Sequence, residues 1–101
     1  MKLHLTKKEF EALYQLLQGS VVSSKPIGIQ VKLFHGVMMG VYKKFYKKAF
    51  DMEKRKYTLT LETHEACAWW LFFNHFPIPA DMLFETNLLL KINNSIHKLV
   101  A

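Results

Sequence analysis

The chain has 101 residues, half of them apolar and 14% aromatic, so it has ample material for a core and is not disordered. The single cysteine, Cys67, excludes an internal disulfide and fits a reducing compartment. The longest apolar run, Ala66–Phe73, is too short to span a membrane, and no secretory signal precedes the charged residues 6–11. We therefore expect one small cytoplasmic domain without a membrane partner.

The net charge of +6 is concentrated in the middle of the sequence. Residues 25–56 contain nine of the 14 basic side chains and only two acidic ones, Asp51 and Glu53. This asymmetry indicates an anionic partner, although charge predicts partners and solubility rather than a fold.

The first segment combines a strand pattern with a helix start. Leu3 and Leu5 alternate with polar residues, which predicts a half-buried strand over residues 2–5. Thr6 and Glu9 have the spacing of a capping box, in which each side chain satisfies a backbone donor of the other residue. An amphipathic helix is expected to follow.

The second helix is expected from Pro26 to about Met52. Pro26 suits a first-turn position, where a missing backbone donor is harmless, and the apolar residues recur at helical spacing. Residues 27–33 also alternate like a strand, and the glycines in this stretch weaken a helix. A strand followed by a shorter helix is therefore the alternative. The expected apolar stripe comprises Ile27, Val31, Phe34, Met38, Val41, Phe45, Ala49 and Met52.

Residues 59–68 repeat the pattern of residues 3–12 at an offset of 56. This weak β–α repeat predicts a second strand over residues 57–61, which should pair with residues 2–5 because neither strand is stable alone. The matched positions are Leu3 and Leu59, Leu5 and Leu61, Glu9 and Glu65, Ala12 and Ala68, and then Leu13, Leu16 and Leu17 with Trp69, Phe72 and Phe73.

The third helix, from about His64 to His75, is apolar nearly all round and should lie at the centre. Prolines in the segment Phe76–Pro79 end it. The last helix is expected from about Ala80 to Leu99. The sequence thus predicts a mainly α fold, with four helices in one core and a short two-stranded ribbon. The inner face of the last helix should comprise Leu88, Leu89, Ile92, Ile96 and Leu99.

Two surfaces are candidates for binding. A row of ammonium groups can follow a polyanion such as nucleic acid, although lysines also commonly solvate an outer helix face. Small residues one turn apart let another backbone approach closely, and an exposed tryptophan favours an oligomer interface. The candidate polyanion-binding residues are Lys43, Lys44, Lys47, Lys48, Lys54, Arg55 and Lys56, and the candidate interface residues are Gly36, Gly40, Trp70 and Leu71.

The case for metal or catalytic chemistry is thin. His64 and Cys67 are three residues apart, but no second ligand pair accompanies them, as a structural zinc site requires. No phosphate-binding glycine loop, paired carboxylates or nucleophile motif is present. We therefore expect no metal, no cofactor and no enzymatic activity.

The leading hypothesis is a non-catalytic interaction or assembly module that binds a second copy of itself or another protein. This hypothesis rests on two observations: the sequence has more aromatic surface than four helices are expected to bury, and it has no recognisable active site. The alternative hypothesis is an accessory nucleic-acid-binding protein that uses the lysine-rich face of the second helix.

Overall fold

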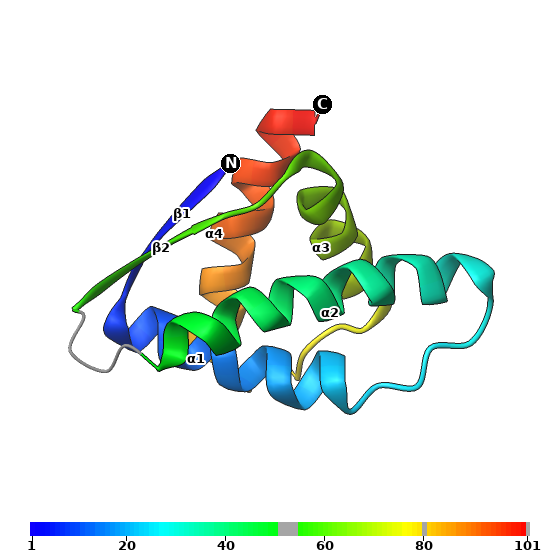
Figure 1. Cartoon of the computed structure of the whole chain (residues 1–101), viewed down its shortest axis with the longest axis horizontal. Helices are drawn as coiled ribbons and strands as arrows, with labels where there is room; N and C mark the ends of the chain where they lie inside the picture. Colours follow the sequence, from blue (N-terminus) through cyan, green and yellow to red (C-terminus); the bar gives the residue numbers. More distant parts are fainter. Residues whose placement is uncertain (51–54, 80, 101) are drawn as a thin grey trace.

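The computed structural model describes residues 1–50, 55–79 and 81–100, except for the side chain of residue 100. The mainly helical fold with a two-stranded ribbon is confirmed (Figure 1). In chain order the elements are β1 (Lys2–Thr6), α1 (Lys7–Leu17), the π-helical segment η1 (Gln18–Val22), α2 (Ile29–Ala49), β2 (Lys56–Thr60), α3 (Thr63–His75) and α4 (Leu83–Val100).

The longest helix, α2, packs mainly against α3, and α4 packs against both α1 and α3. The ribbon lies at one end of the molecule, and the first turns of α2 extend past the other helices at the opposite end (Figure 1). The described helices include none that is both long and apolar enough to cross a membrane.

An aromatic stack joins the ribbon to the helices. The ring of Phe10 on α1 lies between Tyr57 of β2 and Phe45 of α2, with ring centroids 4.0 and 5.4 Å away. Trp69 of α3 continues the stack towards Phe73 and is fully buried. The core therefore buries most of the aromatic surface that, in the sequence, indicated a binding partner.

The β–α repeat is visible in the local structure of both halves. Thr6 caps α1, and the predicted capping box with Glu9 is confirmed by hydrogen bonds of 3.0 and 3.2 Å. Glu62 occupies the same position before α3, where its N–H donates to the Glu65 carboxylate at 2.8 Å. The large apolar residues that the repeat matches on the two helices are all buried: Leu13, Leu16 and Leu17 in α1, and Trp69, Phe72 and Phe73 in α3.

The ribbon register follows the same repeat. The strands are antiparallel, and Leu3 lies opposite Leu59, its own counterpart in the second half. The pairing continues to Leu61, which exchanges backbone hydrogen bonds of 2.8 and 3.0 Å with Met1. The buried leucines at positions 3, 5, 59 and 61 are as predicted, with Tyr57 added to that face. The two halves therefore meet about a local two-fold axis at the Leu3–Leu59 pair.

The start of α2 differs from the prediction. The helix begins at Ile29, and Pro26 precedes it instead of occupying its first turn. Gly28, just before the helix, has a φ of 93°, a backbone conformation that favours glycine. The alternative strand does not form, because residues 29–33 are helical. Ile27, which was expected in the apolar stripe, precedes the helix and is 85% exposed.

Two further boundaries are corrected. The helix α4 begins at Leu83, after the expected start at residue 80, which lies outside the described residues. Leu99 was expected to face the core but is 52% exposed, because the last turn of α4 extends past the helices that cover its earlier turns. Met52 also lies outside the described residues.

Candidate interaction surfaces

The predicted basic residues occupy the C-terminal half of α2 and the start of β2. Lys43 and Lys47 are exposed and Lys48 is half-buried, while Arg55 and Lys56 are exposed at the beginning of β2. Lys54 lies outside the described residues. The described basic residues therefore flank residues 51–54 in the sequence, at the end of α2 and at the start of β2.

Lys44 differs from its neighbours because it has structural partners. Its Nζ donates to the Glu65 carboxylate at 2.5 Å and to the Thr60 carbonyl at 2.9 Å. Burial of Glu65 by itself raises the pKa of that carboxyl group, but the Lys44 ammonium and the Glu62 N–H outweigh burial and hold the pKa below its usual value. Lys44 thus ties α2 to the junction between β2 and α3.

A hollow of about 310 Å³ separates this part of α2 from β2. Lys44, Lys47 and Lys48 line one side of it, and residues 58–60 line the other. None of these lining residues carries a carboxylate. The hollow is therefore electropositive and borders the outer edge of a β-strand.

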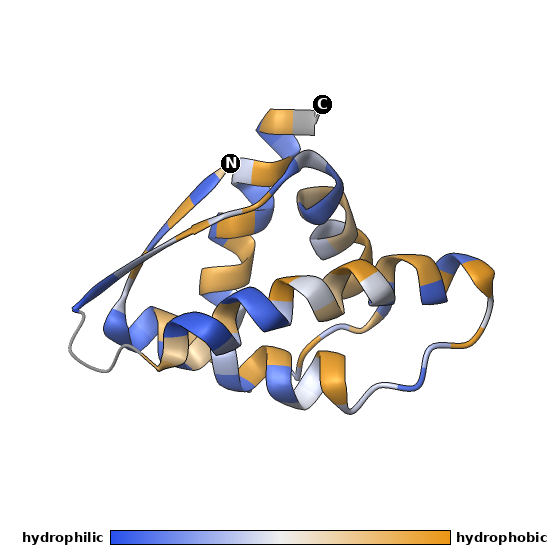
Figure 2. Ribbon diagram, in the orientation of Figure 1, coloured by the Kyte–Doolittle hydropathy of each residue, from blue (hydrophilic) through white to orange (hydrophobic). Residues whose placement is uncertain are grey.

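A second surface, the outer face of α2, runs along the whole helix. We define it by residues at helical spacing that are all exposed: Ile29, Leu33, Gly36, Gly40, Lys43 and Lys47. Ile29 is 88% exposed and Leu33 is 72% exposed. Hydrophobic residues cluster at the beginning of α2 and hydrophilic ones towards its end (Figure 2).

The glycines on the outer face of α2 pack against no other part of the described structure. A Cβ atom added at Gly36 or Gly40 would meet no neighbouring atom within 4 Å. Each glycine nevertheless weakens the helix by about 1 kcal/mol relative to alanine.

The other predicted interface residues lie on α3. Trp70 is half-buried, and its ring stacks on His97 of α4 with centroids 5.7 Å apart. Leu71 beside it is 50% exposed. Trp70 therefore already has a partner within the chain, and the more exposed apolar side chains lie at the start of α2.

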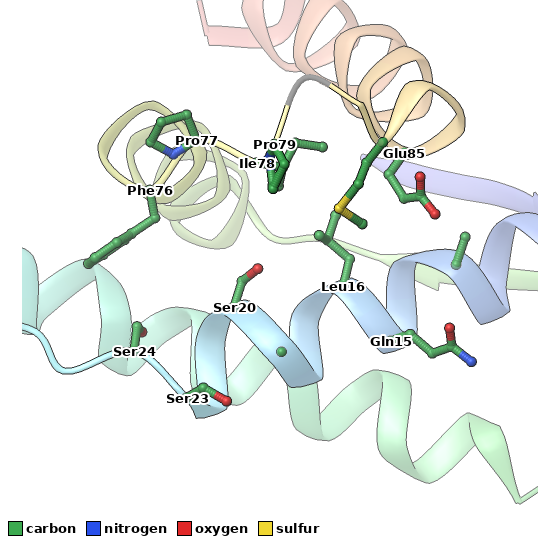
Figure 3. A pocket seen from close by; sticks show the side chains of 13 residues that line it. Gln15, Leu16, Ser20, Ser23, Ser24, Phe76, Pro77, Ile78, Pro79 and Glu85 are labelled. Carbon is green, nitrogen blue, oxygen red and sulfur yellow. The ribbon is translucent and has the colours of Figure 1, made fainter.

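Another hollow, of about 400 Å³, lies where the segment Phe76–Pro79 faces the end of α1 and η1 (Figure 3). Serine hydroxyls, including Ser20 and Ser23, line one wall, and apolar side chains line the other. Glu85 is the one ionisable residue among those that line it. Its described lining therefore lacks the pair of titratable groups that acid–base catalysis uses.

The histidines and the cysteine of α3 form no cluster. Within residues 1–50, 55–79 and 81–100, no three His, Cys, Asp or Glu side chains are placed to hold a metal ion. Cys67 is half-buried and unpaired.

Sequence reasoning missed the apolar half of the outer face of α2 and the hollow beside β2. Ile29 was assigned to the strand-like alternation of residues 27–33, although Ile29 and Leu33 share helical spacing with Gly36 and Gly40. The hollow has no sequence signal, because it depends on where β2 lies relative to α2.

Comparison with known protein families, curated proteins and solved structures finds no match to this chain.

Proposed function

We propose that this chain is a non-catalytic assembly module that pairs with a second copy of itself through the outer face of α2. The supporting observation is the coincidence of exposed Ile29 and Leu33 with two glycines that face open space. Exposed apolar side chains on one continuous face are typical of a protein interface. Glycines at the crossing point let two helices approach more closely than larger side chains allow.

The charges on this face favour an antiparallel pair of α2 helices. If the helices cross between Gly36 and Gly40, Leu33 of one copy lies against Lys43 of the other, and Ile29 lies against Lys47. The aliphatic lysine stems can then cover the exposed apolar side chains while the ammonium groups stay in water. A parallel pair would instead place lysines against lysines and is disfavoured.

The size of the face sets the expected affinity. One helix face per copy buries less than the roughly 800 Å² per partner of a standard stable interface. We therefore expect dissociation in the micromolar range, detectable by sedimentation equilibrium or light scattering behind a sizing column.

Charge substitutions at Leu33 test both the face and its orientation. Leu33→Lys places ammonium groups together in the antiparallel pair and should abolish dimerisation, whereas Leu33→Glu should retain it by pairing with Lys43. Leu90→Lys, at a leucine on α4 that is 58% exposed, is the matched control and should leave the dimer intact. A monomer at several hundred micromolar, or equal effects of Leu33→Lys and Leu33→Glu, would contradict the proposal.

The polyanion-binding alternative is supported by exposed Lys43, Lys47, Arg55 and Lys56. Lys44 contributes less than predicted because Glu65 and Thr60 already bind its ammonium group. The same column run with a mixed-sequence oligonucleotide at low and high salt tests this alternative, since phosphate contacts weaken steeply with salt. For either role we propose a cytoplasmic location, which suits the single cysteine.

A further inference from the structure

The outer edge of β2 carries backbone groups that β1 does not use. Met1 and Leu61 exchange two hydrogen bonds, so the alternation of an antiparallel ladder makes Leu3–Leu59 and Leu5–Tyr57 the other hydrogen-bonded pairs. Thr58 and Thr60 belong to the intervening pairs and direct their N–H and C=O groups away from β1. The bond from Lys44 Nζ to the Thr60 carbonyl confirms this direction.

These groups border the lysine-lined hollow. Among the described residues, the N–H and C=O groups of Thr58 and the N–H of Thr60 have no hydrogen-bond partner. The hollow beside them lies between residues 58–60 and Lys47 and Lys48 of α2. Neither lysine forms an ion pair within the described part of the chain. The site therefore presents both donors and acceptors along one edge and positive charge along the other.

This combination identifies the chemistry of the occupant. A phosphodiester backbone accepts hydrogen bonds but has no N–H donors, so it cannot satisfy an outward carbonyl such as that of Thr58. A peptide in extended conformation offers alternating N–H and C=O groups at the spacing of a sheet. Carboxylates on such a peptide can pair with Lys47 and Lys48.

We propose that an acidic segment of a partner protein binds in extended conformation along β2, as a third strand of the ribbon, with its carboxylates paired to Lys47 and Lys48. Lys44 marks one end of the site. Its ammonium group already donates to the Thr60 carbonyl, so that carbonyl cannot pair with the peptide, and its charge is neutralised by Glu65. This site does not depend on the pairing of α2 helices between two copies.

The corresponding edge of β1 shows why only one side is suited to this ligand. It borders a hollow of about 270 Å³ beside α4, which is lined by Glu9 as well as by Lys2 and Lys91. The outward N–H of Thr6 is already bonded to the Glu9 carboxylate at 3.0 Å. The local two-fold axis thus creates two edges, but among the described residues only the β2 edge combines open backbone groups with charged lining residues that are all lysines.

The test uses a fluorescein-labelled, end-capped heptapeptide in which glutamate alternates with valine, and measures its anisotropy with the full chain at a concentration where the chain is monomeric. N-methylation of alternate residues removes the donors on one side of the peptide. One of the two N-methylation registers should weaken binding by about tenfold or more, and the other should not, because only one side faces β2. Equal effects of the two registers would overturn the proposal.

Variants of the chain locate the site. The double variant Lys47→Glu with Lys48→Glu should weaken binding by about tenfold or more. Lys25→Glu with Lys98→Glu makes the same change in net charge at exposed residues away from the hollow and should leave binding unchanged. Equal losses in both double variants would show a general charge effect and overturn the proposal.

Two further measurements separate strand addition from other modes. Thr58→Pro removes one outward N–H without breaking a bond to β1 and should weaken peptide binding in a chain whose circular dichroism is unchanged. If that variant does not fold, the comparison of the two N-methylated peptides still tests whether the peptide pairs with β2 as a strand. An oligothymidylate of ten nucleotides that displaces the peptide and binds more tightly would overturn the proposal in favour of nucleic acid.

Discussion

The ion pair between Lys44 and Glu65 is the residue-scale contact on which both the fold and the β2 edge depend. Glu65 is 6% exposed and accepts hydrogen bonds from the Lys44 ammonium and the Glu62 N–H. A buried carboxylate without such partners is strongly destabilising. The pair therefore fixes where α2 meets the start of α3.

Replacing Glu65 should change the dependence of stability on pH. Since the folded-state pKa of Glu65 lies below its unfolded value, the carboxylate stabilises the fold at neutral pH and loses this contribution as pH falls through the lowered pKa. Glu65→Gln should lower the free energy of unfolding at pH 7 by about 1–2 kcal/mol and flatten its acid dependence. Urea denaturation between pH 3 and 7 measures both effects.

Lys44→Met is the complementary variant, because it keeps the aliphatic stem and removes the charge. It leaves the Glu65 carboxylate buried with only the Glu62 N–H, so it should destabilise most at neutral pH and least in acid. An acid dependence as steep as that of the parent chain would show that Lys44 does not set the pKa of Glu65.

At the scale of the element, α2 contains glycines with opposite roles. Gly28 before the helix has a φ of 93°, a conformation that other residues adopt only with strain. Gly36 and Gly40 are helical and face open space. Both roles are hidden in the sequence, where the three residues are identical.

Alanine substitutions should therefore change stability in opposite directions. Gly28→Ala should lower the free energy of unfolding by about 1–3 kcal/mol, because of backbone strain alone, since its Cβ would contact nothing. Gly36→Ala should raise it by up to about 1 kcal/mol through helix propensity. The stabilities of the two variants are compared by thermal unfolding of the dilute monomer, followed by circular dichroism. Changes of the same sign would contradict the opposite roles assigned to these glycines.

At the scale of the whole molecule, two β–α–α halves interlock about the ribbon. Each strand pairs only with the strand of the other half, and Phe10 of the first half stacks on Tyr57 of the second. The helix α2 packs mainly on α3, while α4 packs on α1 as well as on α3. Neither half can keep its core without the other.

This interlocking predicts one cooperative unfolding transition. Both tryptophans lie on α3, in the second half, whereas circular dichroism reports all helices. Leu13→Ala, in the first half, should destabilise the chain by about 2–5 kcal/mol and shift both signals equally. A fluorescence transition that stays in place while the dichroism moves would show that the halves unfold independently.

The sequence by itself determined the features that depend on short-range pattern. The leucine alternation, the Thr6–Glu9 spacing and the helical spacing of the apolar residues between Val31 and Ala49 predicted strand, cap and helix, because each involves neighbours within about one turn. The repeat further predicted which strands pair. Backbone conformation at Gly28, in contrast, is fixed by the path that the chain takes into α2.

Only the tertiary structure decided which surfaces remain open. Lys44 and Glu65 are 21 residues apart, and nothing in their local sequence indicates that they meet. Ile29 and Leu33 are exposed because no other described element covers the outer face of α2, and the lysine-lined hollow follows from the position of β2 beside α2. Periodicity shows that a helix has an apolar stripe, but burial depends on which other elements reach it.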